Sequence, residues 1–277
     1  MILMSSAMEI NMKKYSYSIV ILILIAAITV CVYLVGGMVG AYAWTIALFI
    51  AGPLGTVLLL VQLIRLIVKL IKHKSVSTVI ANIASSAILA FPILILSGVL
   101  FIAYPDNEKS SDVLEIEMPV EGAVVSFGGR EYKTHAIWPS ERYAFDILAE
   151  PYDTGDKSLD TYGIYGREVA SPVDGEIIDA HDGEEDIEPN SGEFSSSLGN
   201  YIFIKVKETG AYLILAHLQK GSVQVNQGDA VKAGVVIAEV GNSGTTSEPH
   251  LHIQYQRNDP RKMIFPTCAE SLPIIFK

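Results

Sequence analysis

The sequence predicts three transmembrane α-helices followed by an all-β C-terminal domain, an antiparallel β-sandwich or barrel. No charged residue occurs from Tyr15 to Ile64 or from Ser75 to Pro105, and about 20 apolar residues are enough to cross the hydrocarbon core of a bilayer. From Pro119 onward, short runs of alternating apolar and polar residues are separated by turns rich in Gly, Asp and Asn. That pattern is typical of a sandwich or barrel.

The charge-free stretches divide into spans at glycines and at one charged loop. Gly36, Gly37 and Gly40 interrupt the first stretch, and Pro92 can kink the last span. The expected membrane region covers residues 15–104 and contacts membrane lipid. Its helices are expected at about residues 15–35, 43–68 and 79–104.

The charges that flank the spans predict their orientation. Residues 1–104 carry six Lys or Arg against one Asp or Glu, and the basic residues lie before the first span and around the end of the second. The positive-inside rule places residues 1–14 and the loop after the second span in the cytoplasm. Three spans then place the chain after Tyr104 outside the cell. A signal peptide cleaved near residues 41–43 is the alternative, and it leads to the same location.

The rest of the chain divides into an acidic linker, residues 105–118, and a domain of ordinary size, residues 119–277. After Tyr104 there are fourteen Lys or Arg against twenty-nine Asp or Glu. This balance argues against nucleic acid as a partner, because nucleic-acid binders carry basic patches. Cys31 lies within a span and Cys268 near the C-terminus, so a metal site must use His, Asp or Glu.

Five of the six histidines fall in the C-terminal domain, and two of them stand one residue apart on a predicted strand. Side chains alternate along a strand, so His250 and His252 share a face. Such a pair can bind a metal together, can divide into a ligand and a catalytic group, or can be two solvated strand residues. His217 and Asp146 each end an apolar, strand-like run, where a strand presents a polar side chain to a cleft.

These residues could form a zinc site. Two His and one Asp would leave one position of the metal open for water. The two remaining histidines would then serve proton transfer and oxyanion stabilisation, because the pKa of His lies nearest neutrality. The sequence has no His-Glu-x-x-His motif, so a zinc peptidase of that type is not supported.

Residues 119–256 resemble the lysostaphin-like zinc endopeptidases, whose LytM-type domain cuts peptidoglycan cross-links. The resemblance rests on several segments that occur in family order. They are Ala170–Gly175, Gly199–Tyr201, Ala216–Leu218, Val225–Gly234, Gly241–Gly244 and His250–His252.

The resemblance implies a role for each candidate residue. His135, Asp146 and His252 are implied as the ligands of Zn²⁺, and His217 and His250 as the catalytic pair beside the metal-bound water. The implied fold is an antiparallel β-sandwich or barrel with a duplicated hybrid motif and a groove over the zinc. The implied protein is a membrane-anchored zinc metalloendopeptidase, a hydrolase acting on peptidoglycan peptides during cell-wall remodelling. Its domain 119–277 would lie outside a bacterial cell membrane, with a membrane-protein regulator left open.

The chain departs from the family pattern at the first ligand. The family places that His four residues before the Asp, where this chain has Arg142. The nearest upstream histidine is His135, eleven residues before Asp146, and we expect a longer loop there.

Two alternatives stay open. Relatives that have lost the zinc residues act as binding or regulatory modules that control other wall hydrolases, whereas here all five positions have candidates. Segments 171–175 and 228–234 also resemble the hybrid-motif carrier domains for biotinyl, lipoyl or phosphoryl groups. A lipoyl-type carrier needs a lysine at its hairpin tip, and residues 182–185 offer none. A phosphocarrier would need to face the cytoplasm, which the flanking charges oppose.

Overall fold

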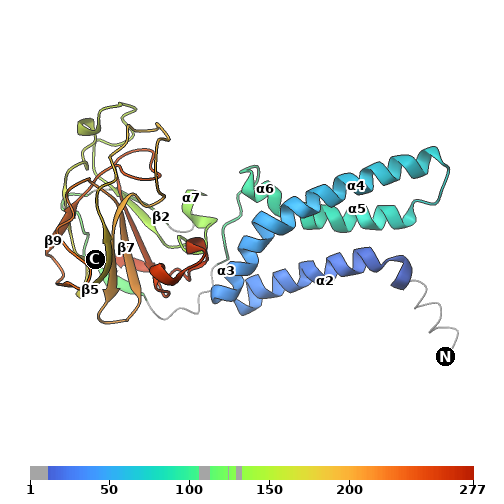
Figure 1. Cartoon of the computed structure of the whole chain (residues 1–277), viewed down its shortest axis with the longest axis horizontal. Coiled ribbons are helices and arrows are strands. Elements are labelled where there is room, and N and C mark those ends of the chain that lie inside the picture. Colours follow the sequence, from blue (N-terminus) through green and yellow to red (C-terminus); the bar gives the residue numbers. More distant parts are fainter. Residues whose placement is uncertain (1–11, 106–112, 124, 129–132) are drawn as a thin grey trace. The chain divides into compact units, whose positions relative to one another are not determined.

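The computed structural model describes residues 12–105, 113–123, 125–128 and 133–277. The chain forms two compact units, which divide between residues 107 and 108. The first unit is helical and the second is built on β-sheets (Figure 1). The all-β C-terminal domain expected from the alternating pattern is therefore confirmed.

The first unit has three stretches that are long and apolar enough to cross a membrane, Ser16–Val35, Gly37–Ile71 and Ser77–Leu96. The first comprises α2 (Ser16–Val30) and the π-helical turn η1 (Cys31–Val35). The second comprises α3 (Gly37–Ile46), the π-helical turn η2 (Ala47–Ala51) and α4 (Gly52–Ile71). The third comprises α5 (Ser77–Ala90) and α6 (Pro92–Leu96).

Two of the expected helix ends were wrong. The second stretch begins at Gly37 rather than near residue 43, because the backbone leaves the right-handed helical conformation at Gly36 and Gly37, with φ values of 66° and 55°. The third ends at Leu96 rather than near residue 104, because Gly98 adopts a φ of 72°, outside the helical range. The sequence stays apolar past Leu96, but the helical conformation ends there.

Neutral polar side chains join the helices of this unit. The Tyr17 and Ser86 hydroxyls lie 2.8 Å apart, and Ser18 donates to Asn82 Oδ1 at 2.8 Å. Asn82 donates in turn to Gln62 Oε1 at 3.5 Å, so one side chain of α5 contacts both α2 and α4. Such bonds between helices replace the water that is absent from a bilayer.

The second unit contains a seven-stranded sheet in the order β2-β3-β10-β7-β6-β5-β8, antiparallel throughout. Its strands are β2 (Val125–Gly128), β3 (Phe145–Leu148), β5 (Gly175–His181), β6 (Asn200–Val206), β7 (Tyr212–Leu218), β8 (Ala230–Val231) and β10 (Leu251–Gln256). Two strand pairs complete the unit: β4 (Glu168–Ala170) with β9 (Val236–Glu239), and β1 (Leu114–Ile116) with β11 (Ile274–Phe276). The β1–β11 pair is parallel.

One face of the large sheet forms the hydrophobic core. Alternate residues of β6 and β7, such as Ile202, Ile204 and Leu213, are fully buried there. They pack against apolar residues of both strand pairs, including Ile237 of β9 and Ile274 of β11. Burial of this many aliphatic side chains, at about 1.5–3 kcal/mol each, fixes the strand register. It thereby also fixes which residues occupy the opposite face.

Candidate metal centre and its histidines

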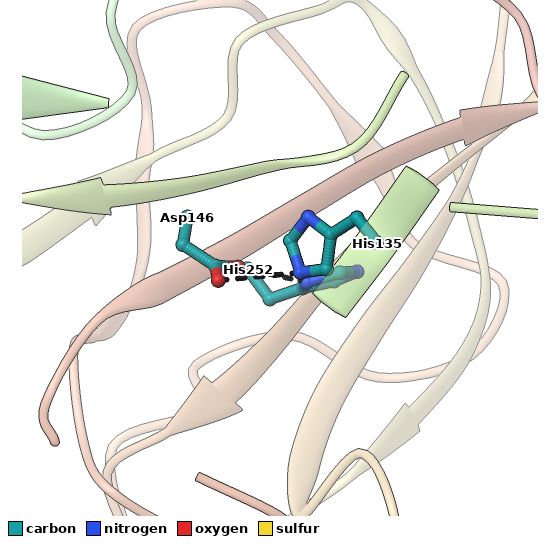
Figure 2. A group of neighbouring side chains, drawn as sticks. All are labelled: His135, Asp146 and His252. Atoms are coloured by element: carbon teal, nitrogen blue, oxygen red, sulfur yellow. Dashed lines mark hydrogen bonds and ion pairs between the residues drawn. The ribbon is translucent and has the colours of Figure 1, made fainter. Parts of the chain in front are cut away.

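Three buried side chains from three separate elements converge on one point. His135 lies on the short helix α7 (Lys133–Ala136), Asp146 on β3 and His252 on β10. Asp146 and His252 are direct partners of adjacent antiparallel strands, and partners in that position share a face. Figure 2 shows the three side chains drawn toward one another.

The distances in this group are those of groups that can share a cation. His252 Nδ1 lies 3.0 Å from Asp146 Oδ1, and His135 Nε2 lies 3.2 Å from Asp146 Oδ2. One ligand atom from each residue lies within 4.8 Å of the others. Two imidazole nitrogens and a carboxylate oxygen are a donor set that suits zinc and leaves a fourth position open. The residues therefore fit the metal that the sequence predicts, and no other such group occurs among the described residues.

His217 reaches the same place through an irregularity of β7. Ala216 is the partner of His252 across β7 and β10, so regular alternation would point His217 to the opposite face, into the core. The pairing of β6 with β7 shifts register between Asn200 and Ile202, and His217 adopts a φ of 62°. Such bulges redirect side chains. The His217 ring accordingly lies 4.7 Å from the His250 ring and 5.8 Å from that of His252, centroid to centroid.

His217 and His250 are anchored in the same way. His217 Nδ1 lies 2.8 Å from the carbonyl oxygen of Ser243, and His250 Nδ1 lies 2.8 Å from that of Glu248. A carbonyl oxygen only accepts, so Nδ1 must carry the proton in both rings. Nε2 is then the atom of each ring that can exchange a proton. His250 Nε2 lies 3.4 Å from Asp146 Oδ1.

The electrostatics of the cluster push the pKa values of its members apart. Burial lowers the pKa of the His217 imidazole well below its ordinary value, and the neighbouring histidines lower it further. Burial alone would raise the pKa of Asp146, but the surrounding histidines hold it well below its ordinary value. Burial likewise opposes the charged form of His252, yet the hydrogen bond and charge of Asp146 raise its pKa. The carboxylate is thus ionised and His217 neutral near pH 7.

The structure brings together all five residues that the sequence singled out. The remaining histidine of the domain, His181, lies outside this cluster. It is the last residue of β5, and its ring stacks on Tyr201 at 5.7 Å. It belongs to a separate aromatic stack that continues to Phe203, 4.3 Å from Tyr201.

Sequence reasoning missed three polar residues around the cluster. Glu141 is close enough for its charge to act on His252, and burial raises the pKa of its own carboxyl group. Gln254 and Gln256 follow His252 on β10 at intervals of two residues and are buried. The two glutamines had a signal in the sequence, because a strand period of two places them on the face of His252.

The polar segment after β5 supports the turn that anchors His217. Asp186 Oδ1 accepts a hydrogen bond from the backbone nitrogen of Asn242 at 2.7 Å, and Asp186 Oδ2 accepts one from the Tyr165 hydroxyl at 3.1 Å. Glu184 accepts from the backbone nitrogens of Ser195 and Ser196, each at 3.1 Å. This acidic segment is therefore tied to the turn beside Ser243.

The fold and the site together define a β-domain with a group of possible metal ligands. Residues 154–263 of this domain match the family model of peptidase family M23. The match contains His217, His250 and His252 but begins after Asp146.

Solved structures of several peptidases are similar to this unit. A peptidase M23 from Pseudomonas aeruginosa is 20% identical, with 52% of this chain and 46% of that chain covered and a TM-score of 0.34. The catalytic domain of the antimicrobial peptidase lysostaphin from Staphylococcus simulans is 23% identical (47% and 74% covered, TM-score 0.31). A zinc-containing peptidase from Vibrio cholerae is 21% identical (51% and 33% covered, TM-score 0.29). The chain thus spans less than half the length of the first and third. A comparison with curated proteins found no match.

Proposed function

We propose that the protein is a membrane-anchored zinc metalloendopeptidase that hydrolyses peptide bonds in peptidoglycan outside a bacterial cell. The observation that carries this proposal is the convergence of His135, Asp146 and His252 beside two histidines whose Nδ1 atoms are committed to backbone carbonyls. The match of residues 154–263 to peptidase family M23 supports peptidoglycan as the substrate. The apolar helices and their basic flanks support the anchor and the location.

His135, Asp146 and His252 would hold the metal. The chemistry supplied there would be that of a Lewis acid, which would make an attacking water more acidic and polarise the scissile carbonyl. Asp146 contributes the negative charge that balances the cation. The histidines around Asp146 hold its pKa well below its ordinary value, so the carboxylate is ionised near neutral pH.

His217 is suited to accept the proton of the attacking water. Its Nδ1–H donates to the Ser243 carbonyl, which leaves the lone pair on Nε2. Burial and the neighbouring histidines keep its pKa low, so the ring is neutral and its Nε2 is free of a proton when substrate arrives. General base catalysis of this kind contributes about 10²–10⁴-fold.

His250 is suited to the opposite half of the reaction. The Glu248 carbonyl fixes its Nδ1–H, and its Nε2 faces the cluster, 3.4 Å from Asp146 Oδ1. With a proton on Nε2, the ring can donate a hydrogen bond to the oxyanion of the tetrahedral intermediate. As the peptide bond breaks, His250 can give this proton to the leaving amine, and the proton that His217 took from the water restores it.

The first test measures metal and cleavage together in the purified full chain in detergent. We expect about one zinc per chain, reduced in His252→Ala. Digestion of peptidoglycan followed by mass spectrometry should show cleaved peptide bonds. His217→Ala should keep the zinc and lose the cleavage. His181→Ala is the matched control, since this histidine lies in the same domain but outside the cluster, and it should retain both.

The outcomes separate the alternatives. Zinc binding without cleavage in the wild type would favour a regulatory module that controls another wall hydrolase. A wild-type chain that binds no zinc would overturn the enzyme. Orientation is tested independently, by adding a protease to intact spheroplasts, which should digest the C-terminal unit.

A further inference from the structure

The strand that carries His252 continues with two buried amide side chains. Gln254 is 6% exposed and Gln256 is 2% exposed. Both lie on the face of β10 that holds His252, because strand side chains alternate. A buried amide is costly unless its oxygen and nitrogen are both hydrogen-bonded. Their partners therefore show what holds them there.

The two glutamines form one continuous hydrogen-bonded chain from His252 to the backbone. His252 Nε2 lies 3.4 Å from Gln254 Oε1, and Gln254 Nε2 lies 2.6 Å from Gln256 Oε1. Gln256 Nε2 lies 2.6 Å from the carbonyl oxygen of Asn258. Each link connects residues two apart in the sequence, so the chain runs along the strand.

The backbone end of this chain sets the direction of every link. The Asn258 carbonyl oxygen can only accept, so Gln256 must turn its NH₂ group toward it. Gln256 Oε1 then faces Gln254 and accepts from the Gln254 NH₂ group. Gln254 Oε1 is left facing His252 and accepts from Nε2–H of that ring. Nε2 of His252 therefore carries a proton, so Nδ1 is the nitrogen that a metal can bind when it replaces the hydrogen bond to Asp146 Oδ1.

The consequence is that His252 presents the nitrogen that the metal site needs. Its Nδ1 lies on the side of Asp146, at 3.0 Å from Oδ1. His217 and His250 have the reverse arrangement, with Nδ1 protonated by their backbone partners. Two different anchors thus give adjacent histidines opposite tautomers. Metal-ligating histidines commonly donate their second N–H to an acceptor that fixes ring and tautomer.

We propose that Gln254 and Gln256 are positioning residues that fix the Nε2–H tautomer and the ring orientation of His252, so that Nδ1 binds the metal. This proposal rests on the proposed function, since it concerns the same metal site. Gln254 acts directly on His252. Gln256 acts by preventing the Gln254 amide from turning its NH₂ group toward the ring.

The test compares zinc affinity in full-length variants, measured by competition with a chelator in detergent. Gln254→Met keeps the side-chain length but removes the acceptor, and we expect zinc to bind about 10–100-fold more weakly. Gln254→Glu restores an acceptor for Nε2–H, so its affinity should stay at or above the wild-type value. Gln256→Met should fall between the wild type and Gln254→Met.

Ser171→Ala is the control for a purely structural effect. Ser171 is also a buried polar residue of this unit, and its hydroxyl donates to the Val173 carbonyl at 2.8 Å. Its loss should lower stability without changing zinc affinity. Rescue by Glu but not by Met distinguishes positioning from packing, because both replacements fill the space.

Two results would overturn the inference. One is a Gln254→Met protein that binds zinc as tightly as the wild type. The other is a Gln254→Glu protein that binds as weakly as Gln254→Met. If Gln254→Met does not fold, Gln256→Met and Gln254→Glu still decide, since weaker binding in the first and retained binding in the second are required. A wild-type chain that binds no zinc would instead overturn the proposed function, and this inference with it.

Discussion

The helical unit and the β-unit bury different kinds of polar side chain. In the helical unit these groups are neutral and bond one helix to another, as Asn82 does with Ser18 and Gln62. In the β-unit the buried polar groups of the site are titratable, and five of them face one another. Neutral hydrogen-bonded groups cost little to bury, whereas uncompensated titratable groups cost several kcal/mol. The helical arrangement therefore suits assembly, and the clustered one suits metal binding and proton transfer.

The largest effect should come from removing the proton acceptor in the titratable cluster. We expect His217→Ala to lower the rate of peptidoglycan cleavage by about 10²–10⁴-fold. Cleavage is measured from released peptides by mass spectrometry. An activity loss of less than about tenfold would show that His217 is not the base.

Removal of the metal should lower the melting temperature of the β-unit and leave that of the helical unit unchanged. The chain has two tryptophans, Trp44 in the helical unit and Trp138 in the β-unit. With zinc at about 1,000 times its Kd, binding stabilises the folded β-unit by about 4 kcal/mol. Excess chelator should therefore lower its melting temperature by about 8–16 °C.

The two tryptophans allow the units to be followed one at a time. Trp44→Phe leaves Trp138 as the reporter of the β-unit, and Trp138→Phe leaves Trp44 for the helices. The transition seen through Trp44 should not respond to the chelator. Equal shifts in both would contradict separate roles for the two units.

The strands and the helices were largely readable from the sequence, and the reasons for the misses are local. The alternation of apolar and polar residues and the length of the charge-free stretches indicate which side chains avoid water. These two patterns therefore predicted the β-domain and the apolar helices. They do not report backbone conformation, so the stop after Leu96 was missed although apolar residues continue. The φ of Gly98 and the hydrogen bond from the backbone nitrogen of Leu100 to the Leu94 carbonyl mark it.

The site was less readable, because its geometry depends on register and on one bulge. Asp146 and His252 are partners across 106 residues of sequence, and no local pattern specifies that pairing. Strand alternation alone would have placed His217 in the core, since its position depends on a φ of 62°. His135 was selected by family resemblance, and the helix α7 that carries it gave no sequence signal. The glutamines could have been found from their spacing to His252.

Removing the hydrogen bonds that join the helices through Asn82 should affect the helical unit alone. We expect Asn82→Leu to destabilise it by about 1–2 kcal/mol, because Asn82 bonds to both α2 and α4 and such bonds contribute about 0.6–1.7 kcal/mol each. Unfolding in SDS, followed through Trp44, measures this. Ser97→Ala is the matched control, since that exposed hydroxyl donates only within its own turn, to the Leu94 carbonyl. Peptidoglycan cleavage should be unchanged in both, and reduced cleavage in Asn82→Leu would show that the helices act on the site.

The smallest effect should come from a titratable pair that is exposed rather than buried. Lys232 donates to Asp174 at 2.7 Å, and this bond, with one from the backbone nitrogen of Ala233, lowers the pKa of Asp174 below its ordinary value of 3.8. As the pH falls, Asp174 is therefore protonated first in the unfolded chain, so its stabilising effect is complete at a pH above 3.8. It disappears as the pH falls through the lower pKa of the folded state. Asp174→Asn should lower the melting temperature of the β-unit by only about 1 °C at neutral pH, because exposed pairs are screened by water and salt. The difference should vanish in acid and in high salt. A difference that persists in both would mean that Asp174 acts through its backbone hydrogen bond rather than its charge.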